Sequence, residues 1–366
     1  MASLAETKFA FARLPHPAPT PAALREAVLQ APGFGTNFSD HMVNIDWSEG
    51  QGWHNATIGP RGPITLDPAA AVLHYAQEIF EGLKAYKQAD GGIALFRPEA
   101  NAARFNRSAQ RLAMPELPEH IFVDAVRELV RADRDWLPTV EGGSLYLRPF
   151  MIATEAFLGV RPAKQYKFLV IASPAGNYFK SGAPAVSIWV SQYTRAAPGG
   201  TGAAKCGGNY AASLVPQAEA IARGHDQVVF LDAAEHKWIE ELGGMNLYFV
   251  FRDGSLITPP LTGTILPGIT RDSLLTLARE QGLTVREERY SIDQWRADAA
   301  SGDLVECFAC GTAAVVTAVG KVSGHGEDFT IGSGGPGQLT SRLKDSLTAI
   351  QSGSVPDVHG WMMPMA

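Results

Sequence analysis

One lysine stands alone in a run of small residues. From Gly199 to Gly208 the chain contains glycine, alanine, one threonine, one cysteine and Lys205. Small side chains allow a flat molecule to approach the backbone, and a lysine partly removed from water can lose its proton and attack a carbonyl carbon. Taken alone, this composition is more often that of a flexible surface loop with a solvated lysine.

Two nucleotide-binding motifs are excluded for this loop. A phosphate-binding loop requires glycine, lysine and then serine or threonine, whereas Lys205 lies between Ala204 and Cys206. A dinucleotide fingerprint beginning at Gly200 would need its third glycine at the position of Lys205. Nucleotide binding therefore does not account for this lysine.

Pyridoxal phosphate is a carbonyl cofactor that such a lysine would hold. It requires phosphate donors, a carboxylate at its ring nitrogen and a donor at its phenolic oxygen. Residues 268–270 begin a predicted helix, where backbone N–H groups and the positive end of the helix dipole attract phosphate. Thr312 is a second hydroxyl donor in a predicted turn, and Glu240 and Glu241 are candidate carboxylates. Taken singly, Thr270 also fits an ordinary helix cap and the glutamates a solvated turn.

The spacing of apolar residues predicts helices and strands around these groups. Residues 247–251 and 255–258, separated by Asp253-Gly254, form a predicted hairpin. Strands and helices do not alternate strictly, so the expected fold class is α+β rather than a doubly wound sheet. Helices are predicted over residues 100–112, 121–137, 211–223 and 270–281, and strands over residues 144–153, 168–172, 186–193, 227–231, 304–309 and 314–319.

Length and composition limit the class of protein. A chain of 366 residues favours two domains, and no apolar run approaches the roughly 18 residues of a membrane span. A net charge of −6 with scattered basic residues argues against nucleic acid as a partner. Three cysteines, and an N-terminus without the pattern of a signal peptide, indicate the cytoplasm. We therefore expect small molecules as partners.

Motifs across nearly the whole chain, from about Phe38 to Ile350, match one known family in order and spacing. They are Leu73-His74-Tyr75, Phe80-Glu81-Gly82, Phe96-Arg97 ahead of Arg104, Tyr146-Leu147-Arg148-Pro149, Arg195-Ala196, Pro198-Gly199-Gly200, Lys205 with Gly207-Gly208-Asn209-Tyr210, Glu241-Leu242-Gly243, the stretch from Leu266 to Arg271, and Gly311-Thr312-Ala313. By these motifs the sequence resembles the branched-chain amino-acid aminotransferases, which are pyridoxal-phosphate enzymes of fold type IV.

The resemblance implies pyridoxal 5'-phosphate as the cofactor and a role for each group around it. Lys205 would form the Schiff base and carry protons, Tyr210 would bond the phenolic oxygen, and Glu241 the ring nitrogen. The residues implied to hold the phosphate or to lie against the ring are Arg104, Leu266, Gly268, Ile269, Thr270 and Thr312.

The resemblance also implies a reaction and an assembly. The reaction is transamination between leucine, isoleucine or valine and 2-oxoglutarate by a ping-pong mechanism. The implied substrate-binding residues are Phe38, Tyr75, Phe80, Tyr146, Arg148, Tyr178, Thr312 and Ala313, with Leu158 and Val160 contributed by the partner subunit of a homodimer. The expected architecture is a small N-terminal domain at 1–180, an interdomain connection at 181–192 and a large C-terminal cofactor-binding domain at 193–366.

Two alternative functions stay open on the sequence. Other members of fold type IV, such as D-amino-acid aminotransferases and lyases acting on aminodeoxychorismate, share the cofactor motifs. A non-catalytic binding protein that keeps the fold belongs to a different class. The motif at Tyr146 and Arg148 and the loop from Gly199 to Tyr210 favour the branched-chain group.

The sequence departs from some relatives at its cysteines. Some eukaryotic members carry a redox-active cysteine pair after the Gly-Thr-Ala turn, where this chain has Ala314 and Thr317. Cys307 and Cys310 lie before the turn, and residues three apart in a strand point to opposite faces. We therefore expect buried thiols rather than a redox switch. The spacing of cysteine, histidine and carboxylate residues suggests no metal site.

Overall fold

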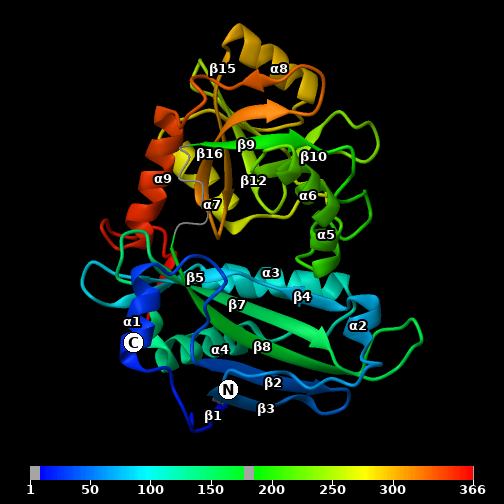
Figure 1. Cartoon of the computed structure of the whole chain (residues 1–366), viewed down its shortest axis with the longest axis vertical. Helices are drawn as coiled ribbons and strands as arrows, with labels where there is room; N and C mark the ends of the chain where they lie inside the picture. The colour runs from blue at the N-terminus through cyan, green and yellow to red at the C-terminus, as the bar shows by residue number, and fades with distance from the viewer. Residues whose placement is uncertain (1–8, 177–184, 366) are drawn as a thin grey trace, which may run out of the picture. The chain divides into compact units, whose positions relative to one another are not determined.

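The computed structural model describes residues 9–176 and 185–365. The chain divides into two compact units, the first made of residues 1–87, 92–176 and 363–366 and the second of residues 88–91 and 177–362. Figure 1 shows the course of the chain and labels its elements. Within the described residues, each unit contains one nine-stranded sheet.

The first unit has a mostly antiparallel sheet in the strand order β1-β3-β2-β8-β7-β5-β6-β18, and β4 pairs with β7. Its strands are β1 (Ala12–Arg13), β2 (His41–Ser48), β3 (Gly52–Pro60), β4 (Glu78–Phe80), β5 (Leu83–Lys87), β6 (Ile93–Phe96), β7 (Ser144–Ala153), β8 (Gln165–Ala175) and β18 (Met362–Pro364). Its helices are α1 (Ala22–Gln30), α2 (Ala71–Tyr75), α3 (Pro98–Arg111), α4 (Glu119–Ala132) and the 3-10 turn η1 (Arg134–Trp136).

An aromatic core joins α3 and α4 to this sheet. Phe105 of α3, Phe122 of α4 and Phe168 of β8 lie with ring centroids 5.4–5.8 Å apart. Apolar residues of α4 recur every three or four positions, so one face of the helix is buried against the sheet. The alternation of β7 turns Tyr146 and Arg148 to the opposite face, where both are half-buried.

The second unit has a mixed sheet in the order β11-β10-β9-β16-β15-β12-β13-β14, and β17 pairs with β16. Its strands are β9 (Ala185–Val190), β10 (Gln227–Leu231), β11 (Ile239–Leu242), β12 (Asn246–Phe251), β13 (Leu256–Thr258), β14 (Val285–Glu287), β15 (Leu304–Gly311), β16 (Val315–Ser323) and β17 (Phe329–Thr330). Its helices are α5 (Gly207–Ala211), α6 (Leu214–Ala222), α7 (Ile269–Glu280), α8 (Ile292–Ser301) and α9 (Gln338–Gln351).

Helices cover both faces of the second sheet. Trp295 of α8 packs edge-on against Phe249 of β12, with centroids 4.9 Å apart. On the other face Tyr248 stacks on Phe308 at 4.9 Å, and its hydroxyl donates to the backbone oxygen of Arg271 in α7 at 2.7 Å. The sheet therefore lies between α8 and α7, and it fixes where α7 begins.

The two cysteines of β15 point to opposite faces of this sheet, as the strand spacing predicted. Cys307 pairs with Phe249 and belongs to the core under α8, whereas Cys310 pairs with Asn246. Burial raises the pKa of Cys310 to about 12 and that of Cys307 well above its usual value. Both thiols are free and buried.

Most of the predicted elements are present, and the α+β fold class is confirmed. The strands predicted at 144–153 and 227–231 match β7 and β10 residue for residue. The hairpin across Asp253-Gly254 is present as β12 and β13, which pair antiparallel. The helix predicted at 121–137 ends at Ala132 and continues only as the turn η1.

The helix predicted at 211–223 is present over most of its length as α6, but it begins later than predicted. The chain forms α5, which ends at Ala211, and α6, which begins at Leu214. Pro216 explains the interruption, because in a continuous helix its ring would collide with the carbonyl of Ala212, four residues before it. Starting a new helix places the proline in the first turn, where a missing N–H is harmless.

The predicted domain limits stay a prediction. The boundary between the two compact units falls between residues 176 and 177. Of the connection predicted at 181–192, residues 181–184 lie outside the described residues, and residues 185–190 form β9 in the second unit.

Candidate active site

A buried asparagine fixes the loop that carries Lys205. Asn209, at the start of α5, is 4% exposed. Its Nδ2 donates to the backbone oxygens of Thr201 at 2.8 Å and Ala204 at 2.9 Å, and its Oδ1 accepts from the Thr201 hydroxyl at 2.7 Å. Because these bonds tie the loop down on both sides, the interpretation as a flexible surface loop is not supported.

Lys205 and Tyr210 contact each other directly. The lysine Nζ donates to the tyrosine hydroxyl at 2.7 Å, and Tyr210 lies on the short helix α5. Gly244 lies close to the same ring, since a Cβ at this glycine would be 3.4 Å from Cε1 of Tyr210. The tyrosine hydroxyl therefore holds the amine in one direction.

Glu241 is the more deeply buried of the two candidate carboxylates. It is 2% exposed in β11, forms an ion pair with Arg195, and accepts a hydrogen bond from the backbone N–H of Leu266 at 3.3 Å. Burial raises the pKa of Glu241 to about 7, and the positive charge of Arg195 opposes this rise. The neighbouring Glu240 instead accepts from the Thr264 hydroxyl at 2.5 Å, so the two candidate carboxylates have different partners.

The start of α7 is built from backbone groups. Gly268 is the N-cap residue and has no side chain to cap the helix. Asn246 of β12 holds the preceding segment, because its Nδ2 donates to the backbone oxygen of Leu266 at 3.1 Å. A Cβ at Gly268 would collide with the Asn246 amide, and Thr270 is buried in the first turn. Such a helix start attracts a phosphate group.

The Thr312 turn lies next to this helix start. Thr312 and Ala313 lie in the turn between β15 and β16. The pair of residues next to this turn in the antiparallel register is Gly311 and Val315. Asn246 pairs with Cys310 near the end of β15, while its side chain bonds the segment before α7. Asn246 therefore connects the end of β15, which precedes Thr312, to the segment that precedes α7.

In the first unit, three of the predicted substrate residues meet on the outer face of β7. The Arg148 Nη2 donates to the Tyr146 hydroxyl at 3.1 Å. The guanidinium carbon lies 4.7 Å from the ring centroid of Phe80 and 5.4 Å from that of Tyr146. An arginine held between aromatic rings combines an apolar wall with a group that binds carboxylates.

Tyr75 groups with the loop that was expected to reach a partner subunit. Its hydroxyl donates to the backbone oxygen of Leu158. Tyr75 is 40% exposed, Leu158 68% and Val160 90%. These three residues therefore form one exposed apolar group, although the sequence placed Tyr75 in the pocket of its own subunit.

The other predicted residues of the first unit have different neighbours. Arg104 is buried in an ion pair with Glu81, and the Phe38 ring centroid lies 5.0 Å from the guanidinium carbon of Arg61. Tyr178 lies outside the described residues.

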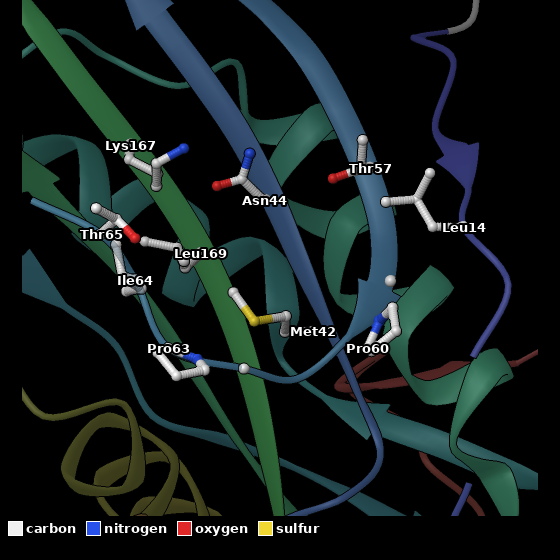
Figure 2. A pocket seen from close by; sticks show the side chains of 12 residues that line it. Leu14, Met42, Asn44, Thr57, Pro60, Pro63, Ile64, Thr65, Lys167 and Leu169 are labelled. Carbon is white, nitrogen blue, oxygen red and sulfur yellow. The ribbon is translucent and has the colours of Figure 1, made fainter. Parts of the chain in front are cut away.

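Figure 2 shows a pocket on the first sheet, and the volume of this pocket is ≈300 Å³. Apolar side chains such as Leu14, Met42 and Leu169 line it, and Lys167 is the charged residue among the described residues of its wall. The Lys167 Nζ lies 2.5 Å from the Asp46 carboxylate. Because that charge is already paired and no predicted site residue lines the pocket, it does not provide the chemistry that the sequence indicates.

Residues 9–176 and 185–365 contain no helix that is long and apolar enough to cross a bilayer. In the same residues, no group of three or more histidine, cysteine, aspartate or glutamate side chains is placed to hold a metal ion.

Comparison with known proteins decides the family. Residues 78–322 match the family described as amino-transferase class IV. A branched-chain-amino-acid aminotransferase of Mycolicibacterium smegmatis is 58% identical over 349 residues, which cover 94% of this chain and 95% of that protein. The chain belongs to the class IV aminotransferase family. The family predicted from the motifs is thereby confirmed.

Solved structures of this class agree with the fold. A branched-chain amino acid aminotransferase of Escherichia coli superposes with a TM-score of 0.74 at 30% identity, covering 88% of this chain and 100% of that one. A branched-chain amino acid aminotransferase of Thermobaculum terrenum, described in its pyridoxal-phosphate (PLP) form, gives a TM-score of 0.70 at 26% identity, with 88% and 98% covered.

The second unit of this class IV aminotransferase offers the groups that pyridoxal phosphate requires. An amine and a phenol meet at Lys205 and Tyr210. Glu241 supplies a buried carboxylate, and α7 begins at Gly268 with no side chain capping its first N–H groups. The donor set therefore fits the cofactor.

Sequence reasoning gave no role to three polar residues that organise the site, namely Arg195, Asn209 and Asn246. Each uses its side chain to bind backbone oxygens of a neighbouring segment. Arg195 and Asn209 do lie in the matching motifs, next to small residues. A long or amide side chain beside small residues is a signal that could have indicated such backbone binding.

Proposed function

We propose that this aminotransferase transfers the amino group between leucine, isoleucine or valine and 2-oxoglutarate, with pyridoxal 5'-phosphate as its cofactor. The observation that carries the proposal is the contact of Lys205 with Tyr210 in the unit that also holds the buried Glu241. Pyridoxal phosphate supplies an aldehyde and an electron-withdrawing ring, which acidify the α-hydrogen of an amino acid.

The residues of the chain then have separate tasks. Lys205 would hold the cofactor covalently until the amino acid displaces it; the freed Nζ would then take a proton from the α-carbon in one half-reaction and return one to it in the other. Tyr210 orients that amine through their 2.7 Å hydrogen bond and would also hydrogen-bond the phenolic oxygen of the cofactor. Glu241 would hydrogen-bond the ring nitrogen. We assign the phosphate to Arg104, Gly268, Ile269, Thr270 and Thr312, and the face of the ring to Leu266.

The substrate must be held by residues that accept both aliphatic and acidic side chains. Burial of a branched chain contributes about 0.8 kcal/mol per methylene, which separates leucine, isoleucine and valine only weakly. For glutamate we assign the second carboxylate to Arg148 and the Tyr146 hydroxyl, which already hydrogen-bond each other. Phe38, Phe80 and Tyr178 are assigned to the aliphatic side chain, and Thr312 and Ala313 also to the substrate.

We propose a cytoplasmic homodimer. The exposed group of Tyr75, Leu158 and Val160 supports this assignment, because it presents apolar surface to solvent. Since Tyr75 bonds Leu158, all three would enter the partner's pocket together. Sedimentation of the wild type is expected to give a dimer and that of Val160→Asp a shift toward monomer with loss of activity. A wild-type monomer with full activity would contradict the assignment.

Substrate choice is tested by assaying L-leucine, D-alanine and aminodeoxychorismate side by side under identical conditions. We expect turnover of L-leucine with 2-oxoglutarate and little or none of the other two. Inactivity toward L-leucine in cofactor-saturated protein would exclude the branched-chain assignment, and turnover of D-alanine or aminodeoxychorismate instead would identify the other type IV functions.

The role of Lys205 is tested by covalent labelling. Borohydride reduction is expected to fix one cofactor per wild-type chain, and none in Lys205→Ala that has kept its fold by circular dichroism. Lys237→Ala is the matched control, because Lys237 is an exposed lysine of the same unit and its loss should leave labelling unchanged. Labelling that persists in Lys205→Ala would refute the role.

A further inference from the structure

Arg195 connects three segments of the second unit. It follows β9 in the chain and is 8% exposed. Its guanidinium forms an ion pair with Glu241 of β11, and its Nη2 donates to the backbone oxygens of Gly202 at 3.0 Å and Thr264 at 3.2 Å. One buried cation therefore touches the strand of the carboxylate, the loop of the lysine and the segment that leads to α7.

Those segments are packed closely together, so the side chain of Arg195 has little space to move. A Cβ at Gly202 would lie 2.5 Å from the backbone oxygen of Thr264, so the lysine loop rests directly on the segment before α7. The same segment bonds the two glutamates of β11, through the Thr264 hydroxyl at 2.5 Å and the Leu266 N–H at 3.3 Å. Replacement of the Arg195 guanidinium would therefore affect Glu241 most directly, because the two side chains form an ion pair.

The charge of Arg195 matters because Glu241 is buried. A carboxylate removed from water is held in its neutral form unless a positive charge compensates. Burial raises the pKa of Glu241 to about 7 even though Arg195, the largest opposing influence, lowers it. Without the arginine, the carboxyl would be protonated at neutral pH and would donate a hydrogen bond instead of accepting one.

We propose that Arg195 is a positioning residue which keeps the Glu241 carboxylate ionised and directed at the ring nitrogen of the cofactor. This inference rests on the proposed function, which assigns Glu241 to that nitrogen. An ionised Glu241 accepts a charge-assisted hydrogen bond from a protonated ring nitrogen, and that protonation makes the ring a stronger electron sink. Arg195 itself touches neither substrate nor cofactor in this assignment.

A purely structural role for Arg195 predicts a different result from the electrostatic one. If the arginine only ties the lysine loop to the Thr264 segment, its loss would weaken binding of any ligand shaped like the cofactor. If it sets the charge of Glu241, its loss would weaken only ligands that carry the ring nitrogen. Pyridoxal phosphate and its 1-deaza analogue, in which a CH group replaces that nitrogen, separate the two cases.

The experiment measures dissociation constants of both ligands with the apoprotein of the wild type, Arg195→Met and Arg195→Lys. We expect the wild type to prefer pyridoxal phosphate, and Arg195→Met to lose about tenfold or more of that preference, in line with the strength of a hydrogen bond to a charged group. The affinity for the deaza analogue should stay nearly unchanged. Arg195→Lys keeps the charge and should keep most of the preference.

A second readout follows the proton itself. In protein loaded with cofactor labelled with ¹⁵N in the ring, the nitrogen resonance is expected at a protonated position in the wild type and to shift toward the unprotonated position in Arg195→Met. An equal loss of affinity for both ligands, or an unchanged preference and resonance, would overturn the inference. If Arg195→Met does not fold, Arg195→Lys decides: a lost preference in that folded, charge-retaining variant would also overturn it.

The same data test the proposed function separately. A wild-type apoprotein that binds neither ligand, or that shows no preference between them, contradicts the cofactor or the assignment of Glu241. If the wild type prefers pyridoxal phosphate over the deaza analogue and Arg195→Met keeps that preference, the proposed function stands and the role of Arg195 is contradicted.

Discussion

Glu81 and Arg104 form a bidentate ion pair inside the first unit. The arginine Nε donates to Oε1 at 2.7 Å and its Nη2 to Oε2 at 2.8 Å. Glu81 is 0% and Arg104 3% exposed, and the backbone N–H of Gly82 also donates to the glutamate, at 3.1 Å. Glu81 therefore binds the Nε and Nη2 edge of the guanidinium.

The first prediction concerns stability. Arg104→Met should lower the free energy of unfolding by about 3–5 kcal/mol, because it leaves the Glu81 charge buried without its partner. Urea denaturation of the apoprotein measures this change. The double variant Glu81→Leu with Arg104→Met should recover most of the loss, since no charge is then buried. Equal instability of the single and double variants would show that the ion pair is not the cause.

The second prediction uses the double variant as a folded protein without the arginine. If Arg104 binds the phosphate, the double variant should bind pyridoxal phosphate at least about tenfold more weakly than the wild type, as expected for losing a hydrogen bond to a charged group. Its affinity for pyridoxal, which has no phosphate, should stay the same. Parallel loss for both ligands would place the defect in the shape of the protein and not in phosphate binding.

The elements were easier to predict than the contacts between them. β7 was predicted at its observed bounds because this stretch is rich in Leu, Tyr, Phe and Ile. No strand was predicted over β2, although apolar Val43, Ile45 and Trp47 alternate there with polar residues, and this period of two is a signal that could have indicated the strand.

The site was predicted from the sequence only in part, for a physical reason. Lys205 and Tyr210 are five residues apart, so a loop and one short helix are enough to bring them together. Arg195 and Glu241 belong to different segments, and their ion pair depends on how β9, the lysine loop and β11 pack. Local periodicity carries no information on that packing, and the motif match identified Arg195 without a role.

The third prediction concerns the thiols. Cys206, Cys307 and Cys310 are buried, and a thiol reacts as its exposed thiolate. The native protein should therefore react with Ellman's reagent very slowly, whereas all three cysteines of the sequence should react after unfolding in guanidinium chloride. Prompt reaction of Cys307 and Cys310 in the native protein, with a disulfide formed between them, would instead support a redox switch.

The last prediction concerns pH and begins from the buried carboxyl. The pKa of Glu241 in the folded chain is raised from 4.5 to about 7 by burial. A raised pKa means that the contribution of Glu241 to folding is fully present below about pH 4.5 and is lost as the pH rises through about 7. Binding of the cofactor has the opposite dependence, because a protonated Glu241 loses the charge-assisted hydrogen bond to a protonated ring nitrogen.

The affinity for pyridoxal phosphate should therefore fall as the pH decreases below about 7, by up to roughly tenfold per pH unit. The phosphate of the ligand also titrates in this range, so the informative quantity is the ratio of dissociation constants between the wild type and Glu241→Gln. The glutamine has the same shape and does not titrate, and the ratio should change with pH only if Glu241 does. A ratio that is constant across neutral pH would mean that Glu241 stays ionised throughout, and that Arg195 compensates its burial more fully than the raised pKa indicates.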